Sequence, residues 1–359
     1  MGKNTSDRLT DGEVIELCRA LGDDYAAYGL KLPEPAPEPL RESLREGYRA
    51  GLARVGRPRA ADRFVRKWLQ LRYNALTRGR AVSNEVTVDL LRRLDVTACP
   101  VTLATLTHGE QKSTDWSVDR LNNDGAYAKG NLAIMSTHAN GAKRTKNLAE
   151  VRKLSEGDST VDGLAPEEWS RMAAVMYGPC VFEHPEDQWE MRQVAPVPEG
   201  VVRLQWQIFQ DYLVRSATAL PKEATQYLPF FLKRLPNNQL RSSTKIMVQL
   251  IGERAHALAS PFDVWFADDL FGRYKVFFEF LWECTDGKPL EVMRGAYQKI
   301  PISDRMASEF RFDTRGYLDS SPSDNLEGGG DFGDPFKASG SGTQRIVGPT
   351  NTRSSPRRR

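Results

Sequence analysis

A single short stretch in the middle of this sequence holds the side chains best suited to metal chemistry. Residues 117–121 alternate polar and apolar side chains, which predicts a short strand. The Asn-Asn-Asp-Gly run at 122–125 predicts a tight turn, because these residues accept left-handed backbone conformations. Residues 131–135 predict a second strand, after which Ser136 or Thr137 caps a predicted helix. The predicted order is strand, loop, strand, helix.

Two side chains in this unit have the chemistry of metal ligands. Asp119 lies at the end of the first predicted strand and Asn140 lies on the predicted helix, so a compact unit would bring them together. Carboxylate and amide oxygens are hard ligands that suit Mg²⁺ or Mn²⁺. Such a pair in a positive field suits a phosphodiester substrate. The basic residues of the stretch are Arg120, Lys129, Lys143, Arg144 and Lys146.

The same residues resemble a known family. They are similar to the HNH endonucleases of the His-Me finger superfamily, in the branch with Asp-Arg that is common in phages and mobile elements. The resemblance covers about residues 60–150 and includes an upstream Cys-Pro-Val-Thr at 99–102. The matching segments are Ser117-Val118-Asp119-Arg120-Leu121-Asn122, Gly125-Ala126-Tyr127, Gly130-Asn131 and Asn140-Gly141-Ala142-Lys143.

The resemblance implies a role for each of four residues. Asp119 and Asn140 would bind the metal, and Asn131 would orient the catalytic base or tighten the loop. Arg120 stands where the family usually carries the histidine that activates water. Arginine cannot take a proton from water at physiological pH. Arg120 would therefore stabilise charge on the phosphate, or the protein would cleave slowly or bind DNA without cutting it.

Two histidines are alternative candidates for the missing base. His138 precedes Asn140 by two residues, and His108 lies in the preceding loop. Side chains two positions apart on a helix point in directions that differ by about 200°, so His138 is expected to face away from the metal site. Ordinary polar histidines are the simpler interpretation of both.

Structural roles are the alternative for the candidate ligands as well. Asp119 would then form a surface ion pair with Arg120 or Lys143. Asn131 would be a turn residue. Asn140 would cap or pack the helix.

Many HNH proteins also bind structural zinc through two CxxC pairs. The corresponding positions here are Cys99 with Thr102 and Ser136 with Ala139. One thiolate does not make a zinc site, so the resemblance implies no structural zinc.

Residues 60–78 predict a long helix with apolar residues at helical spacing and a strongly basic remainder. We expect Arg63, Arg66 and Lys67 of this helix, together with Lys143, to contact nucleic-acid phosphates. A solvated basic face without a ligand is the alternative. Further helices are predicted at 7–30 (capped by Thr10 or Asp11), 39–54, 87–94 and 166–177.

The predicted fold class is an α-rich α+β fold in which an HNH-like ββα-metal finger is embedded in helices. A mainly helical second domain and a disordered tail rich in Gly, Ser and Pro follow it. The expected divisions are 1–58 (helices and a Pro-rich linker), 59–150 (nuclease-like domain), 151–200 (connecting helix and linker), 201–317 (helical domain) and 318–359 (tail).

Composition narrows the class of protein. The 359 residues are 40% hydrophobic and 27% charged, with a net charge of +3, so charge distribution says more about partners than net charge does. Four separated cysteines disfavour a disulfide framework, and no apolar run is long enough to span a membrane. We expect a cytoplasmic, metal-dependent DNA endonuclease. The alternatives are a DNA-binding protein that keeps the finger as a scaffold, and an interaction protein whose region 201–305 binds a protein partner.

Overall fold

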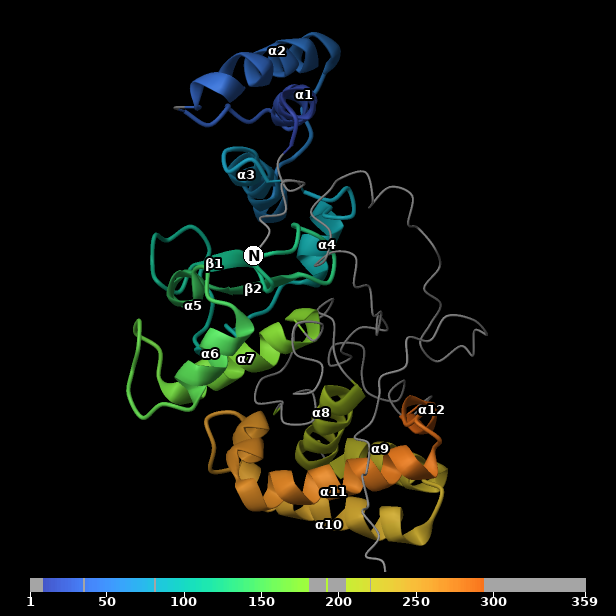
Figure 1. Ribbon diagram of the computed structural model, residues 1–359. Coiled ribbons are helices and arrows are strands. Elements are labelled where there is room, and N and C mark those ends of the chain that lie inside the picture. The colour runs from blue at the N-terminus through green and yellow to red at the C-terminus, as the bar shows by residue number, and fades with distance from the viewer. Residues whose placement is uncertain are drawn as a thin grey trace, which may run out of the picture.

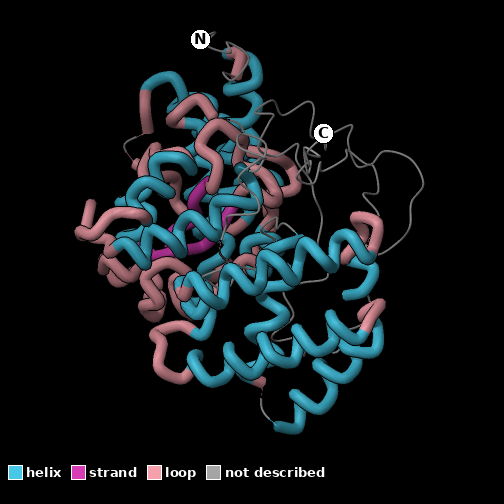
Figure 2. The backbone as a smooth tube through the Cα atoms, turned by 60° about the horizontal axis from the view of Figure 1, so that its bottom comes forward, coloured by secondary structure: helices cyan, strands magenta, loops and turns pink. Residues whose placement is uncertain are grey.

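The computed structural model describes residues 9–34, 36–80, 82–180, 192, 205–219 and 221–293. The predicted tail and most of the linker predicted before residue 200 lie outside the described residues. The described chain is rich in helices and carries one two-stranded antiparallel sheet (Figures 1 and 2), as the α-rich α+β class predicts. No described helix is both long enough and apolar enough to cross a membrane.

Two N-terminal helices, α1 (Asp11–Ala27) and α2 (Glu38–Arg54), pack against each other at one end of the molecule (Figure 1). The Thr10 side chain caps α1 in a reciprocal capping box with Glu13. The helices approach closely at two glycines. A Cβ on Gly22 would lie 2.1 Å from the carbonyl oxygen of Leu44, and one on Gly47 would lie 2.0 Å from that of Arg19.

Helix α3 (Arg63–Leu76), capped by Asp62, joins this hairpin to the rest of the protein. Val65 and Leu69 belong to the core of the hairpin, whereas Leu71 and Ala75 belong to the main core. The next helix, α4 (Val88–Arg93), is capped by Thr87.

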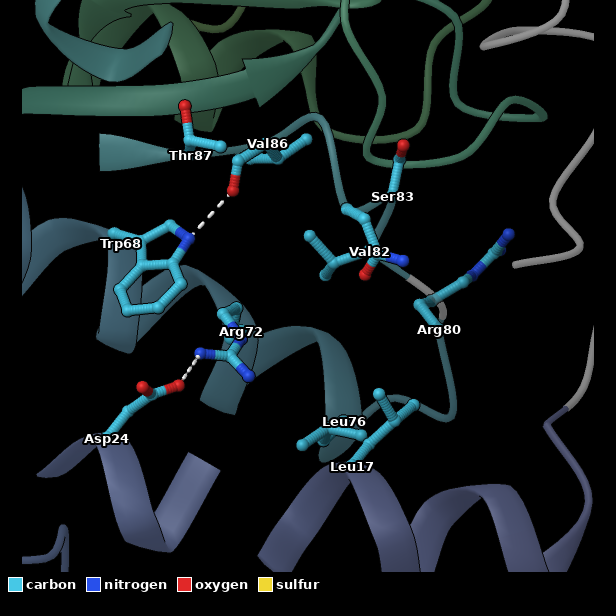
Figure 3. A pocket seen from close by; sticks show the side chains of 11 residues that line it. Leu17, Asp24, Trp68, Arg72, Leu76, Arg80, Val82, Ser83, Val86 and Thr87 are labelled. Carbon is cyan, nitrogen blue, oxygen red and sulfur yellow. Dashed lines mark hydrogen bonds and ion pairs between the residues drawn. The ribbon is translucent and has the colours of Figure 1, made fainter. Parts of the chain in front are cut away.

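The indole of Trp68 on α3 holds the segment that leads into α4. Its Nε1 donates to the Val86 carbonyl over 2.7 Å, and Arg72 of the same helix pairs with Asp24 of α1 (Figure 3). These contacts fasten α3 on both sides.

Strands β1 (Trp116–Arg120) and β2 (Leu132–Ser136) pair antiparallel, with Trp116 opposite Ser136 and Arg120 opposite Leu132. Each strand begins one residue from its predicted start. All five residues of β2 are buried, because other elements cover both faces of that strand. Helix α5 (Thr137–Lys143) follows directly, and Ser136 caps it by accepting from the Ala139 N–H.

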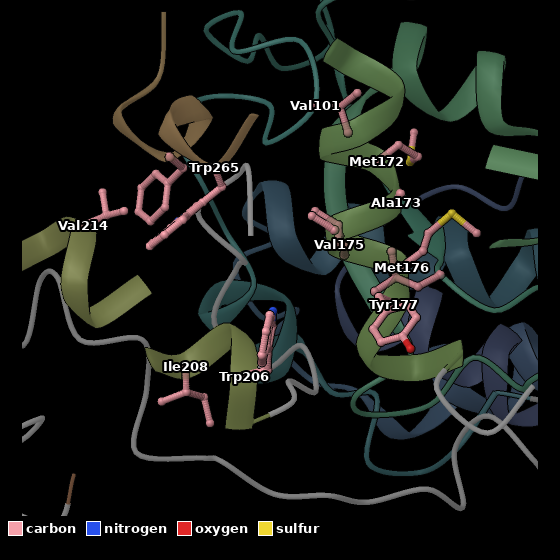
Figure 4. Close-up of a cluster of buried hydrophobic side chains, with 14 of the residues drawn as sticks. Val101, Met172, Ala173, Val175, Met176, Tyr177, Trp206, Ile208, Val214 and Trp265 are labelled. Atoms are coloured by element: carbon pink, nitrogen blue, oxygen red, sulfur yellow. The ribbon is translucent and has the colours of Figure 1, made fainter. Parts of the chain in front are cut away.

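The remaining described elements are helical, and their core is continuous with that of the ββα unit. Figure 4 shows Met172 and Val175 of α7 in the same buried cluster as Val101, Trp206 and Trp265. These elements are α6 (Leu148–Ser155), α7 (Pro166–Cys180), α8 (Gln205–Thr218), α9 (Pro221–Arg234), α10 (Asn238–Ala255), the 3₁₀ helix η3 (Pro261–Phe266), α11 (Asp268–Cys284) and α12 (Leu290–Met293).

One buried guanidinium ties three of these parts together. Arg171 of α7 donates to both carboxylate oxygens of Asp263 in η3, over 3.2 and 2.7 Å, and to the Val101 carbonyl over 3.1 Å. Such a charge is tolerated in a core only when its donors are paired. Arg171 therefore links the loop before the sheet to the C-terminal helices.

The close approach of α1 and α2 generates a prediction. Gly22→Ala or Gly47→Ala should lower the free energy of unfolding by about 2–3 kcal/mol, since the new methyl group has to push the partner backbone away. Hydrogen exchange of the α1 and α2 amides measures the loss locally. Gly12→Ala in α1 is the control, because a Cβ at Gly12 would meet nothing within 4 Å. Equal protection in all three variants would contradict the prediction.

Candidate functional site

The two predicted metal ligands lie on facing surfaces of a strand and a helix. Ser117 and Asp119 share one side of β1 because they are two residues apart, and Asn140 and Lys143 lie about one turn apart on α5. Asn140 Nδ2 donates to Ser117 Oγ over 2.7 Å, and Lys143 Nζ lies 3.0 Å from Asp119 Oδ2. The loop from 121 to 131 closes this unit at one end.

Lys143 is not on the surface, where a phosphate contact would require it to be. Its side chain is fully buried. Besides facing Asp119, its Nζ donates to the Arg120 carbonyl over 2.7 Å and to Asn123 Oδ1 over 3.3 Å. The expected DNA contact by Lys143 therefore does not fit this arrangement. The ammonium instead bonds to groups inside the ββα unit.

Asp119 is only 8% exposed. Burial raises the pKa of its carboxyl group, and the Lys143 ammonium opposes that rise. The Lys143 ammonium lies 3.0 Å from the buried Oδ2 of Asp119 and pairs with it. Asp119 thus forms the ion pair with Lys143 that was the structural alternative, but the pair is buried and does not lie on the surface.

Asn140 is half-buried, and its amide group is only partly used. Its Nδ2 is bonded to Ser117, whereas no hydrogen bond from the described part of the chain reaches its Oδ1. The amide oxygen of Asn140 is consequently open to a metal, whereas Oδ2 of Asp119 already faces the Lys143 ammonium.

Arg120 braces the loop that follows β1. Its Nη1 donates to the carbonyls of Asn123 and Gly125, over 2.8 and 2.9 Å, and its guanidinium lies 4.9 Å from the centre of the Tyr127 ring. Burial lowers the pKa of Arg120, but a guanidinium remains a cation at neutral pH. This side chain is positioned as a brace and not as a base.

Asn131 is fully buried and closes the same loop from its other end. Its Oδ1 accepts from the Asn122 N–H over 2.8 Å, and its Nδ2 donates to the carbonyls of Asn122 and Ala126 over 2.9 and 3.0 Å. Of the roles implied by the resemblance, these bonds support loop tightening. Both the oxygen and the nitrogen of this amide are engaged with the backbone of the loop.

Neither candidate histidine reaches Asp119. His138 Nε2 lies 3.1 Å from the carbonyl of Gly163, in the loop between α6 and α7. His108 contacts Arg63 and packs edge-on against Trp116, 5.3 Å between ring centres. Trp116 precedes Asp119 by three strand residues, roughly 10 Å.

The basic residues of α3 divide into two kinds. Lys67 Nζ donates to the Trp116 carbonyl over 3.1 Å and lies 5.0 Å from the centre of its indole ring. Arg63 pairs with Asp95 and lies over the same indole. Burial lowers the pKa of Lys67, against the attraction of Asp115. Arg63 and Arg66 are both exposed, and of these two Arg66 makes no contact with the described residues.

Sequence reasoning missed the role of Trp116, which anchors α3 to β1 through Arg63 and Lys67. The signal that was present is the i, i+4 spacing of the two cations on one face of α3.

Cys99 joins the two segments that carry zinc ligands in many HNH proteins. Its Sγ accepts from the Thr102 N–H over 3.4 Å and from the Ser136 N–H over 3.3 Å. The prediction that the finger binds no structural zinc stays a prediction. Weak thiol hydrogen bonds and packing hold these segments together here.

The side-chain groups of Asp119 and Asn140 are of the type that binds hard cations. Carboxylate and amide oxygens are what Mg²⁺ or Mn²⁺ prefers, but the carboxylate of Asp119 is already paired with Lys143. No group of three or more His, Cys, Asp or Glu that could hold a metal occurs in the described residues. Comparisons of the chain with protein-family models, curated proteins and solved structures found no match.

The bonding of Asn131 generates a second prediction. Asn131→Ala should cost about 2–4 kcal/mol of unfolding free energy, because it strands two carbonyls and an N–H inside the loop. Denaturant unfolding measures this loss. Asp124→Ala in the same loop is the control, since Asp124 is exposed. If the two variants are equally stable, Asn131 does not hold the loop.

Proposed function

We propose that this protein is an HNH-like endonuclease that hydrolyses DNA phosphodiester bonds with the help of Mg²⁺ or Mn²⁺. The observation that carries the proposal is the packing of β1, which carries Asp119, against α5, which carries Asn140. The amide oxygen of Asn140 accepts no hydrogen bond from the described residues, and the carboxylate of Asp119 is paired with the Lys143 ammonium. The order of β1, β2 and α5 is also that of the family the sequence resembles.

In this proposal Asp119 and Asn140 would hold the metal ion. A bound divalent ion would polarise the scissile phosphate and acidify a water molecule. The chain's own residues position and protect that site. Ser117 orients Asn140 through its hydroxyl group, while Arg120 and Asn131 keep the adjacent loop closed.

DNA binding would use exposed cations near the finger. Arg66 is the member of the basic helix that is available to a phosphate, since Arg63 and Lys67 are engaged with Trp116. Arg144 at the end of α5 is exposed as well. Exposed cations of this kind give sequence-independent binding.

A second candidate function is a DNA-binding protein of a phage or mobile element that keeps the finger as a scaffold. Two observations favour it. The ammonium of Lys143 lies against the carboxylate of Asp119, and no histidine of the described chain contacts Asp119 or Asn140. A protein partner for region 201–305 stays a prediction.

Plasmid nicking decides between these two functions. The wild type should relax supercoiled plasmid in Mg²⁺ or Mn²⁺ but not in EDTA, and Asn140→Ala should lower the rate roughly a hundredfold, about 3 kcal/mol of barrier. Asn140 is the better probe, because truncating Asp119 would leave a fully buried ammonium unpaired and destabilise the fold. His138→Ala should keep the wild-type rate. Absence of nicking by the wild type in either metal would leave the scaffold function.

The salt dependence of DNA binding tests the exposed cation on α3. Arg66→Gln should weaken binding to all sequences and reduce the slope of log K against log salt concentration by about one phosphate contact. Lys245→Gln on α10 is the matched control, since Lys245 is also exposed. The same slope for the wild type and both variants would mean that α3 presents only a solvated face.

A further inference from the structure

We propose that the ammonium group of Lys143 is the resident cation of the finger and occupies the site that a divalent metal would take at Asp119. Three oxygens surround Nζ: the Arg120 carbonyl at 2.7 Å, Asp119 Oδ2 at 3.0 Å and Asn123 Oδ1 at 3.3 Å. The side chain is fully buried. This inference rests on the proposed function only in taking Asp119 as the metal ligand.

The three oxygens make a cation site in the chemical sense. A carboxylate, a backbone carbonyl and an amide carbonyl are the donor types that Mg²⁺ and Ca²⁺ sites combine. They come from the end of β1 and from the loop after it, so a cation among them holds that loop to the strand. The ammonium reaches them from α5 and holds the helix there too.

A metal ion and this ammonium compete for Oδ2 of Asp119 in the arrangement described. Mg²⁺ binds carboxylate oxygens at about 2.1 Å, and a second cation 3.0 Å from the same oxygen would repel it strongly at low dielectric. Binding of a divalent ion at Asp119 therefore requires Lys143 to move away. It follows that the finger folds without metal and that the wild type binds divalent ions weakly at Asp119.

An ordinary buried ion pair makes a different prediction. In that case the oxygens are only the partners of a lysine, and removing the ammonium destabilises the protein without creating a site. If the oxygens form a cation site, removing the ammonium creates a vacancy that a divalent ion fills. The response of the Lys143 variant to metal separates the two cases.

The experiment measures thermal unfolding of the full chain in EDTA and in millimolar Mg²⁺ or Mn²⁺, at matched ionic strength. Lys143→Met keeps most of the side-chain volume and should lower the midpoint in EDTA by on the order of 10 °C. Divalent ions should restore several degrees to this variant, because binding to the native state alone stabilises it. The wild-type midpoint should not respond, and neither should that of Lys153→Met, in which an exposed lysine is removed.

A double variant locates the metal. Asp119→Asn combined with Lys143→Met should lose the response to divalent ions, since the charged ligand is gone. A response that survives in the double variant places the metal elsewhere and overturns the proposal. A Lys143→Met variant that folds but ignores metal also overturns it.

The wild-type measurement decides the matter even if Lys143→Met does not fold. A wild-type midpoint that rises by several degrees in Mg²⁺ would show that metal binds with the ammonium in place, which contradicts the proposal. Lys143→Gln, which keeps a donor for the Arg120 carbonyl, is the second variant for the metal response. The experiment contains no DNA, so its outcome does not depend on whether the protein nicks plasmid.

Discussion

A buried ammonium has to be surrounded by oxygens, and in this protein that requirement organises the ββα unit. Lys143 draws the end of β1, the loop at 121–131 and α5 to one point, because its acceptors come from the first two and its backbone from the third. Asn131 closes the same loop with three buried hydrogen bonds. The strand and the helix that carry the two candidate ligands lie side by side as a consequence of this packing.

The positions of other cations also depend on the groups that they contact. A basic helix looks like a nucleic-acid surface in sequence, yet Arg63 and Lys67 fasten α3 to the indole of Trp116. Cations engaged in this way stabilise the fold, and the phosphate contacts predicted for Arg63 and Lys67 stay predictions. The positive charge on the surface near the finger therefore depends on exposed side chains such as Arg66. The number of Arg and Lys residues in the sequence overestimates that charge.

The ββα unit is not an isolated finger. The buried pair of Arg171 and Asp263 also engages the Val101 carbonyl, so the loop before β1 is bonded to the helices at 166–293. Leaving either charge unpaired in a core is costly. Changes in the C-terminal helices thus have a physical route to the position of β1, through α7 and the Val101 loop.

Local signals in the sequence determined the elements and their order. Thr10, Asp62, Thr87 and Ser136 cap the helices that follow them, since capping depends only on residues within one turn. The strand–loop–strand–helix order was predictable to within a residue for the same reason, and the resemblance selected Asp119 and Asn140 from it. Only the tertiary structure decided where the side chains point. Lys143 lies inside, Arg120 braces the loop, and Asn131 bonds to backbone, because a polar side chain faces solvent or interior according to which distant oxygens and rings pack beside it.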